Sequence, residues 1–120
     1  MVDAPHTVIA FATPDDLWNW LGENGRTHPG LWVRLAKARS GVASVTFDEL
    51  LEAGIAFGWS ESTRRAGDTE TYLQRFTPRR VRGTASARNL AIAARLEREG
   101  RMTESGRAAL ASPLPSGNER

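Results

Sequence analysis

The residues with the clearest potential for chemistry are three arginines that follow Pro78, namely Arg79, Arg80 and Arg82. Neighbouring guanidinium groups repel one another unless solvent or an acidic partner relieves the charge. The planar fork of each guanidinium binds carboxylates and phosphates through two parallel hydrogen bonds. This spacing predicts an anion-binding site; in the alternative interpretation, one arginine pairs with an acid elsewhere in the fold and the others face water.

Aromatic side chains are natural walls for such a site. In a chain of this length we expect most aromatic residues to fill the core, which applies to Trp18, Trp20, Trp32, Phe47, Phe57 and Phe76. Trp59 and Tyr72 differ because they flank a predicted hairpin, and we expect both to reach a cleft. The predicted ligand-binding residues are therefore Trp59, Tyr72, Arg79, Arg80 and Arg82.

The formal net charge of +2 conceals an uneven distribution along the chain. Residues 1–63 contain four basic and eight acidic residues, whereas residues 64–107 contain eleven arginines and five acidic residues. The second segment is basic enough to meet a polyanion, so nucleic-acid binding is an alternative hypothesis. A bias towards arginine codons is the other interpretation, since the chain has fifteen arginines and one lysine.

A third hypothesis is an enzyme. It would use the Glu61 or Asp48 carboxylate as a general base beside one of the arginines, and that carboxylate must lie within hydrogen-bond reach of a substrate. The chain lacks the Gly-x-Ser-x-Gly turn of many hydrolases and the glycine loops that bind nucleotides. His6 and His28 lie in separate predicted loops without a metal-ligand spacing, so we expect no metal and no other cofactor.

Length and composition set the frame for these hypotheses. The chain has 120 residues, of which 40% are hydrophobic and 25% are charged, the balance of one globular domain. It has no cysteine, which excludes disulfides, thiolate metal sites and thiol catalysis. The first residues carry an acid where a signal peptide carries bases, and no apolar run approaches the ~18 residues of a membrane span. We therefore expect a cytoplasmic protein without membrane insertion, as a monomer or a weak homodimer.

Caps and periodicity predict the elements that must position these residues. In the first half we expect a short strand within residues 6–11, a helix that begins after Thr13 and a strand over residues 31–37. Alternation along the second strand puts its leucines and Val33 on one buried face and Trp32 on the other. The rest of the chain predicts a helix, a hairpin and two more helices, over about residues 47–58, 59–76, 86–99 and 103–112.

Two signals make the helix boundaries in this second part specific. Thr46 and Glu49 form a capping box, and Gly100 fits the left-handed position that closes a helix. The order of elements predicts a small α+β domain over residues 1–112, with an antiparallel sheet of three to four strands and helices packed mainly on one face. Residues 113–120 predict a disordered tail.

Short motifs follow one another along this order: Trp20-Leu21, Gly30-Leu31-Trp32-Val33, Phe57-Gly58-Trp59, Phe76-Thr77-Pro78-Arg79-Arg80, and Glu99-Gly100-Arg101-Met102-Thr103 with Gly106. In this order they resemble the YdeI/OmpD-associated family, also labelled bacteriocin-protection, over about residues 9 to 111. The resemblance implies a small bacterial cytoplasmic protein and brings no established catalytic mechanism. Two segments depart from the family's usual residues, namely Ser60-Glu61-Ser62 and Thr84-Ala85-Ser86.

Among the three hypotheses, the sequence favours a small binding module. The arginine run would hold an anionic small molecule or an acidic protein segment between the Trp59 and Tyr72 walls. This hypothesis predicts ordered arginines around a concavity. Nucleic-acid binding predicts a continuous basic face instead, and the enzyme ranks last.

Overall fold

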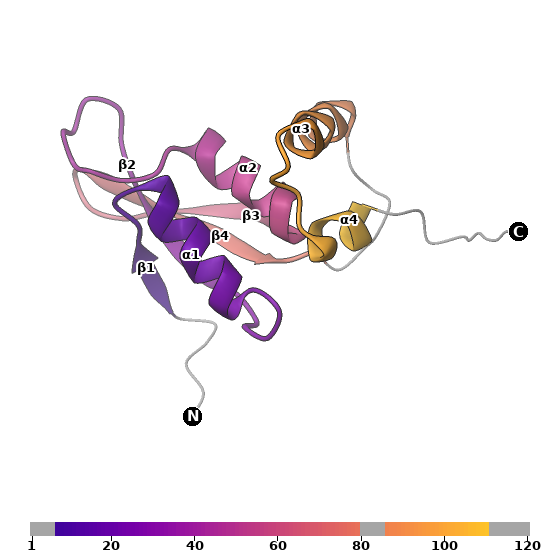
Figure 1. Ribbon diagram of the computed structural model, residues 1–120. Helices are drawn as coiled ribbons and strands as arrows, with labels where there is room; N and C mark the ends of the chain where they lie inside the picture. The colour runs from indigo at the N-terminus through magenta and orange to yellow at the C-terminus, as the bar shows by residue number, and fades with distance from the viewer. Residues whose placement is uncertain (1–6, 80–85, 111–120) are drawn as a thin grey trace, which may run out of the picture.

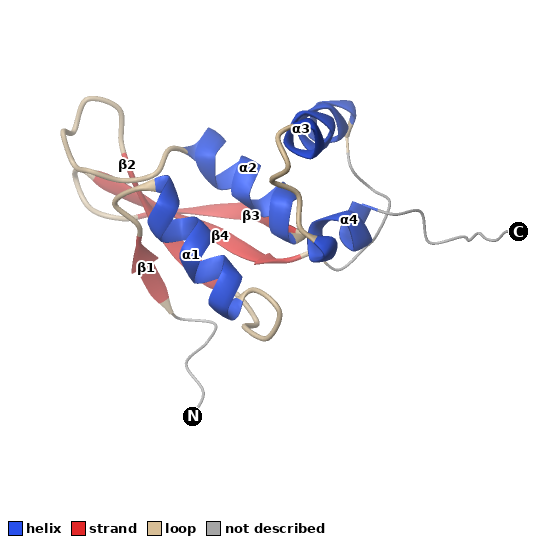
Figure 2. Ribbon diagram, viewed as in Figure 1, coloured by secondary structure: helices blue, strands red, loops and turns tan. Residues whose placement is uncertain are grey.

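The computed structural model describes residues 7–79 and 86–110. Figure 1 shows the order of elements: β1 (Val8–Ala10), α1 (Pro14–Asn24), β2 (Leu31–Ala36), α2 (Phe47–Phe57), β3 (Trp59–Ala66), β4 (Thr71–Pro78), α3 (Ala87–Arg98) and α4 (Glu104–Leu110). The strands form one sheet, and Figure 2 shows α1 and α2 across one side of it. The predicted α+β class is confirmed, and the predicted tail over residues 113–120 lies outside the described residues.

The sheet has the strand order β1-β2-β4-β3 and is mixed. β4 pairs antiparallel with both β2 and β3, whereas β1 pairs parallel with β2. The prediction of an antiparallel sheet is therefore wrong for β1. The reason is the crossover through α1, which carries the chain back along the sheet so that β2 starts at the same end as β1.

The two helices on the sheet begin where their capping residues predict. Thr13 Oγ1 accepts a hydrogen bond from the Asp16 N–H at 3.2 Å at the start of α1. Thr46 and Glu49 complete the capping box of α2, with bonds of 2.9 and 3.0 Å. These bonds satisfy amides that the first helical turn leaves without partners. Gly58 ends α2 in the left-handed conformation, at φ 82°, which glycine adopts without a steric penalty.

The C-terminal helices α3 and α4 pack on α2, beyond the part of it that covers the sheet (Figure 1). The backbones of α2 and α4 come close enough to exclude a side chain. A Cβ at Gly106 would lie 2.7 Å from the Ile55 carbonyl oxygen. Thr103 holds the same contact, since its N–H and its hydroxyl donate to the Ala56 carbonyl at 3.1 and 2.6 Å. Glycine at position 106 therefore permits the close approach of α2 and α4.

Apolar side chains form two adjoining clusters. The first lies between the sheet and the helices α1 and α2, with the buried members Phe11, Leu17, Leu21, Leu31, Val33, Leu35, Val45, Leu50, Ala53, Trp59 and Phe76. The second joins α2 to α3 and the loop before α4, with the buried members Leu51, Ile55, Ala56, Ala93, Leu96 and Met102. Helix α2 contributes to both clusters. The predicted buried face of β2 is confirmed, because its leucines and Val33 all belong to the first cluster.

A β-bulge interrupts the ladder between β3 and β4, between Glu61 and Arg64. At this point the Gln74 side chain of β4 is 2% exposed, and its amide donates to the carbonyls of Ser62 and Thr63 at 3.0 and 3.2 Å. A buried amide without partners would destabilise the fold by about 1–3 kcal/mol. The bulge carbonyls and the Gln74 side chain therefore stabilise each other.

Candidate functional site

Two arginines lie over one tryptophan ring on the face of the sheet opposite α1 and α2. The Arg65 guanidinium carbon is 4.5 Å from the centroid of the Trp32 ring, and that of Arg75 is 5.6 Å away. Both distances fall within the ~6 Å range of cation–π attraction. Trp32 is 8% exposed although, by alternation with the core residues Leu31 and Val33, its side chain leaves the sheet on the side opposite α1 and α2. We call these three residues the arginine–tryptophan cluster.

Strand register explains how the cluster forms. Trp32 of β2 and Arg75 of β4 are direct partners, so their side chains leave the sheet on the same side. The bulge shifts the register of β3, so that Arg65 faces this side opposite Leu73 while Arg64 faces the helices. From there Arg65 reaches across β4 to the ring. Without the extra residue in β3, Arg65 would project towards α2.

Arg34 of β2 lies on the same face but is bound within the hairpin turn. Its Nη1 donates to the Thr71 hydroxyl at 3.0 Å and lies 3.8 Å from the Asp68 carboxylate. The other Asp68 oxygen accepts from the Thr71 hydroxyl and from the Thr71 and Glu70 N–H groups, at 2.8 to 2.9 Å. The hydrogen bond from the Thr71 hydroxyl is the main cause that lowers the pKa of Asp68 below its ordinary value. Arg34 therefore stabilises the hairpin turn through its contacts with Thr71 and Asp68.

Trp59 does not line a cleft, and that prediction is wrong. Its side chain is 1% exposed, and its ring centroid is 5.6 Å from that of Trp20 and 5.0 Å from that of Phe76. The indole N–H donates to the Gly25 carbonyl at 2.9 Å. The physical reason is burial: a ring of this size gains most in the core when its one polar group also has a partner there.

Tyr72 and Arg79 lie at opposite ends of β4, roughly 20 Å apart along an extended strand. Tyr72 packs against the first cluster and lies under Arg64, whose guanidinium carbon is 4.3 Å from its ring centroid. Arg79 follows the other end, where its N–H donates to the Gly58 carbonyl at 2.8 Å. The fold therefore does not bring Tyr72 and Arg79 together in one cleft. Two predicted site residues lie outside the described residues, namely Arg80 and Arg82.

The two carboxylates considered for catalysis lie on different elements. Asp48 is in the first turn of α2, where its side chain is 79% exposed and 3.2 Å from Arg88. Glu61 lies on β3 opposite Phe76. Neither carboxylate lines the pocket described below. Asp48 stabilises the N-terminus of α2 with its negative charge and forms an exposed ion pair with Arg88.

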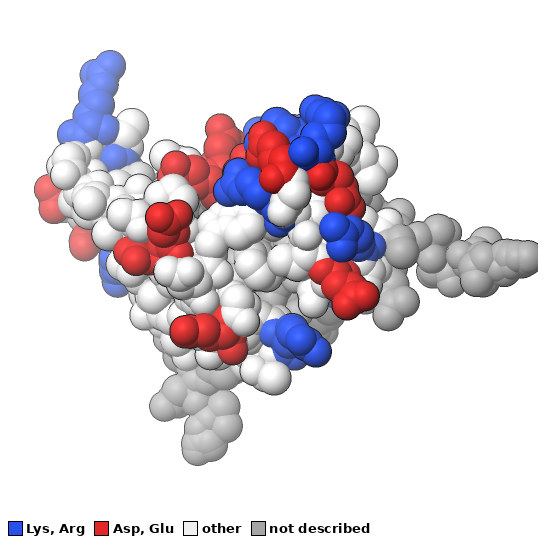
Figure 3. Space-filling view, viewed as in Figure 1, with Lys and Arg blue, Asp and Glu red and all other residues white. Residues whose placement is uncertain are grey.

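Arginines of α3 and of the loop after it pair with acids. Arg95 donates to Glu52, and Arg101 lies 3.2 Å from the same carboxylate. Glu99 joins both arginines at 3.3 Å. Figure 3 shows acidic and basic side chains interspersed over this side of the molecule. Positive charge on this side is therefore interleaved with negative charge.

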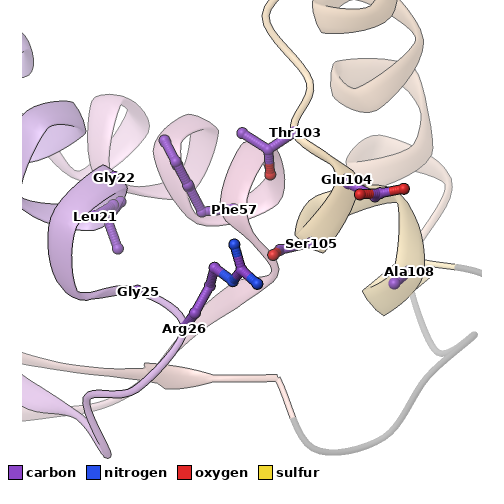
Figure 4. Close-up of a pocket in the computed structure, with 9 residues that line it drawn as sticks. All are labelled: Leu21, Gly22, Gly25, Arg26, Phe57, Thr103, Glu104, Ser105 and Ala108. Carbon is purple, nitrogen blue, oxygen red and sulfur yellow. The ribbon is translucent and has the colours of Figure 1, made fainter.

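A pocket of about 320 Å³ opens between the ends of α1 and α2 and the start of α4 (Figure 4). It is lined by Leu21, Gly22, Gly25 and Arg26, by Phe57, and by Thr103, Glu104, Ser105 and Ala108. The Arg26 guanidinium points into the pocket towards Ser105. No local sequence signal marks Arg26, because it is a single arginine in a loop. Only the packing of α4 on α2 brings the second half of the lining beside it.

The described parts of the chain contain neither a candidate metal site nor a candidate membrane-spanning helix. No group of three or more His, Asp or Glu side chains there could hold a metal ion. No helix there has the length and the apolar character needed to cross a membrane.

Comparison with known proteins gives one match. The sequence pattern of a family described as Domain of unknown function (DUF8412) matches residues 9–109. No curated protein and no solved structure matches the chain. Since the matched range runs from β1 into α4, the chain belongs to the DUF8412 family, whose description states no function.

Proposed function

We propose that this protein is a binding module for an acidic protein segment, which lies on the sheet face that carries the arginine–tryptophan cluster. One observation supports the proposal above all: two guanidinium groups lie over a single ring, at 4.5 and 5.6 Å from its centroid. The Arg65 side chain is exposed and, within the described residues, forms no ion pair or hydrogen bond. A carboxylate bound on this face gains charge-assisted hydrogen bonds from it.

The Trp32 ring prepares both arginines for such a ligand. Ordering a long side chain on binding costs about 0.5–1.5 kcal/mol. Stacking on the ring restricts Arg65 and Arg75 before the ligand arrives. A guanidinium that lies flat over a ring keeps the donors along its N–H edge for a carboxylate. A planar carboxylate suits this edge.

The rest of this face offers little competition from acids. Among the described strand residues whose register places them on this face, none is acidic; beside the cluster they include Ser60, Leu73 and Thr77. Around the cluster an acidic ligand therefore meets no described acidic strand residue, and Asp68 at the hairpin turn is paired with Arg34 and Thr71.

Arg79 extends the proposed surface along β4. Its N–H bond to Gly58 continues the ladder past Pro78, and alternation puts Arg79 on the same side as Arg75. Four residues of strand separate these two arginines by about 13 Å. Acidic side chains four residues apart in an extended peptide have the same separation. We propose that Arg79 binds a second carboxylate of the segment, with Arg80 and Arg82 following it in the chain.

An acidic polypeptide fits this face better than a nucleic acid does. Single-stranded nucleic acids bind largely by stacking their bases on exposed rings. Trp32 offers little ring surface, since it is 8% exposed beneath its arginines. The ion pairs of Arg95 and Arg101 also interrupt a basic path over the helical side. Nucleic-acid binding is therefore the alternative outcome of the test.

Fluorescence anisotropy with three labelled probes tests the proposal. The probes are a short extended peptide with glutamates four residues apart, the same peptide with glutamines, and a single-stranded oligonucleotide. At about 0.1 M salt we expect the glutamate peptide to bind best, and Arg65→Gln to weaken it about tenfold. Arg98→Gln is the matched control because Arg98 is exposed on α3, away from the sheet.

Equal binding of the two peptides would contradict the proposal, and so would an equal effect of Arg65→Gln and Arg98→Gln. Preferential binding of the oligonucleotide, with an affinity that falls steeply as salt rises, would favour the alternative. The double variant Arg79→Ala/Arg80→Ala tests the extension along β4. It should weaken peptide binding and leave thermal unfolding nearly unchanged; a large loss of stability would assign these arginines to the fold.

Kinship with the YdeI/OmpD-associated family is also a proposal, as is a cytoplasmic location. Contacts between the motif segments support the kinship. A Cβ at Gly58 would lie 2.8 Å from the Ser105 carbonyl oxygen, and Thr103 donates to Ala56, 47 residues away along the chain. Two of the five motif segments, at residues 57–59 and 99–106, therefore lie side by side where α4 packs on α2, which relates the resemblance to the fold.

A further inference from the structure

We propose that the pocket between α1, α2 and α4 binds a small monocarboxylate with an apolar body. Its volume of about 320 Å³ is at the lower end of the range for small-molecule sites. At roughly 30 Å³ for each water-sized group, it holds a molecule of about ten non-hydrogen atoms. The pocket shares no residue with the arginine–tryptophan cluster, so this inference goes beyond the proposed function.

Arg26 supplies the positive charge for the carboxylate. Figure 4 shows its guanidinium extending into the pocket towards Ser105. Within residues 7–79 and 86–110, the Arg26 side chain makes no ion pair or hydrogen bond, and the same holds for the Ser105 hydroxyl. A charged fork and a hydroxyl that face each other across a pocket suit one carboxylate.

The remainder of the pocket suits an apolar body. Half-buried Phe57 provides the apolar surface on the side of α1 and α2, where the buried Leu21 also borders the pocket. Ala108 adds a methyl group from α4. A short alkyl chain or a small ring leaves water when it packs against these side chains, which favours binding.

Glu104 restricts the charge of the ligand. It lines the pocket from the start of α4. A second negative charge on the ligand would approach this carboxylate and be repelled. The pocket therefore favours a monocarboxylate over a dicarboxylate or a phosphate.

The wall that carries Ser105 is held in place before any ligand binds. The Thr103 hydroxyl donates to the Ala56 carbonyl at 2.6 Å and accepts from the Gly106 N–H at 3.1 Å. These bonds occupy Thr103 and hold the start of α4 against α2. A preformed site of this kind loses little free energy to reorganisation on binding.

Hexanoate is the probe, and hexanamide, which has a similar shape without the charge, is the matched control ligand. Each is titrated into the full chain while NMR records the backbone amide shifts. We expect hexanoate to bind with a Kd of about 1 mM and to shift the amides of Gly25, Phe57 and Ser105. Hexanamide should bind about tenfold more weakly. Adipate, a dicarboxylate of the same chain length, should also bind more weakly, and Glu104→Gln should reduce that difference.

Arg26→Gln should weaken hexanoate binding about tenfold and leave hexanamide binding and the Tm unchanged, because Arg26 is exposed. Arg65→Gln should leave hexanoate binding unchanged, which separates this site from the arginine–tryptophan cluster. Equal binding of hexanoate and hexanamide would overturn the inference. No binding at about 20 mM hexanoate, shifts centred elsewhere, or an affinity insensitive to Arg26→Gln would overturn it too.

Discussion

The helical layer and the open face of the sheet hold their arginines in different ways. In the helical layer, Arg95 and Arg101 share the Glu52 carboxylate, so their charge is neutralised where it stands. On the sheet face, Arg65 lies over the Trp32 ring beside Arg75, and contact with a ring orders a guanidinium without neutralising it. A count of arginines therefore does not measure the positive charge that a protein offers to a ligand. The neighbours of each guanidinium decide it.

The largest loss of stability is expected for a substitution at Gly106, because the packing of α4 on α2 depends on this glycine. A Cβ there would collide with the carbonyl oxygens of Ala56 and Ile55, so Gly106→Ala must push α4 away from α2. We expect a loss of about 3 kcal/mol in the free energy of unfolding, measured by urea denaturation. Gly22→Ala is the control, because a Cβ at Gly22 meets no atom within 4 Å and alanine favours the helix by about 1 kcal/mol. If Gly106→Ala is as stable as the wild type, then α2 and α4 leave enough space between them for a methyl group at this position.

The next effect concerns the sheet face. Trp32→Leu keeps an apolar side chain and removes the ring beneath the two arginines, so we expect a loss of about 2 kcal/mol in the free energy of unfolding. Binding of the glutamate peptide should fall by more than the stability change explains, at a temperature where the variant is folded. Val42→Ala, at a position that is 39% exposed in the loop before α2, should change neither quantity much. Peptide binding that survives Trp32→Leu would show that the ring does not order the arginines.

The ion pairs of Glu52 in the helical layer should make a smaller contribution to stability. Glu52→Gln removes the carboxylate that Arg95 and Arg101 share, and its side chain is 26% exposed. We expect a loss of about 0.5–1 kcal/mol at low salt, because ion pairs near the surface are weak. The difference from the wild type should shrink at about 1 M salt, where exposed charges are screened. Urea denaturation at both salt concentrations measures it; a difference that does not respond to salt would contradict the ion-pair explanation.

The smallest effect is a pH dependence at the hairpin turn. The pKa of Asp68 is lowered, first by the Thr71 hydroxyl and then by the Glu70 N–H. A lowered pKa in the folded state means that the charged carboxylate stabilises the fold above its ordinary pKa of about 4. This stabilisation is lost as the pH falls through the lower folded-state pKa. Asp68→Asn should therefore flatten the pH dependence of unfolding below about pH 4, and parallel curves for the two proteins would assign that dependence elsewhere.

Local signals in the sequence account for much of the fold. Thr13 and the Thr46–Glu49 box start their helices as predicted, and alternation along residues 31–37 identifies the buried face of β2, because each signal involves residues close in the chain. The parallel pairing of β1 and the bulge in β3 depend on contacts between distant segments. No pattern within a single segment carries that information.

The same limit explains the candidate site. The arginine run after Pro78 is visible as a run, whereas Arg65 and Arg75 meet at Trp32 only after two strand registers and one bulge are known. Trp59 flanks the hairpin, and that position alone predicts a cleft. Its place in the core follows from the helices that close over the start of β3, which the hairpin pattern does not contain.

The bulge in β3 has a consequence for the behaviour of the protein in concentrated solution. β3 is one border of the sheet, and a kinked border presents its unpaired backbone groups out of line. The other border, β1, is 3 residues long. A straight strand from a second molecule thus finds no long template on either side, and we expect the sheet to resist growth into fibrils.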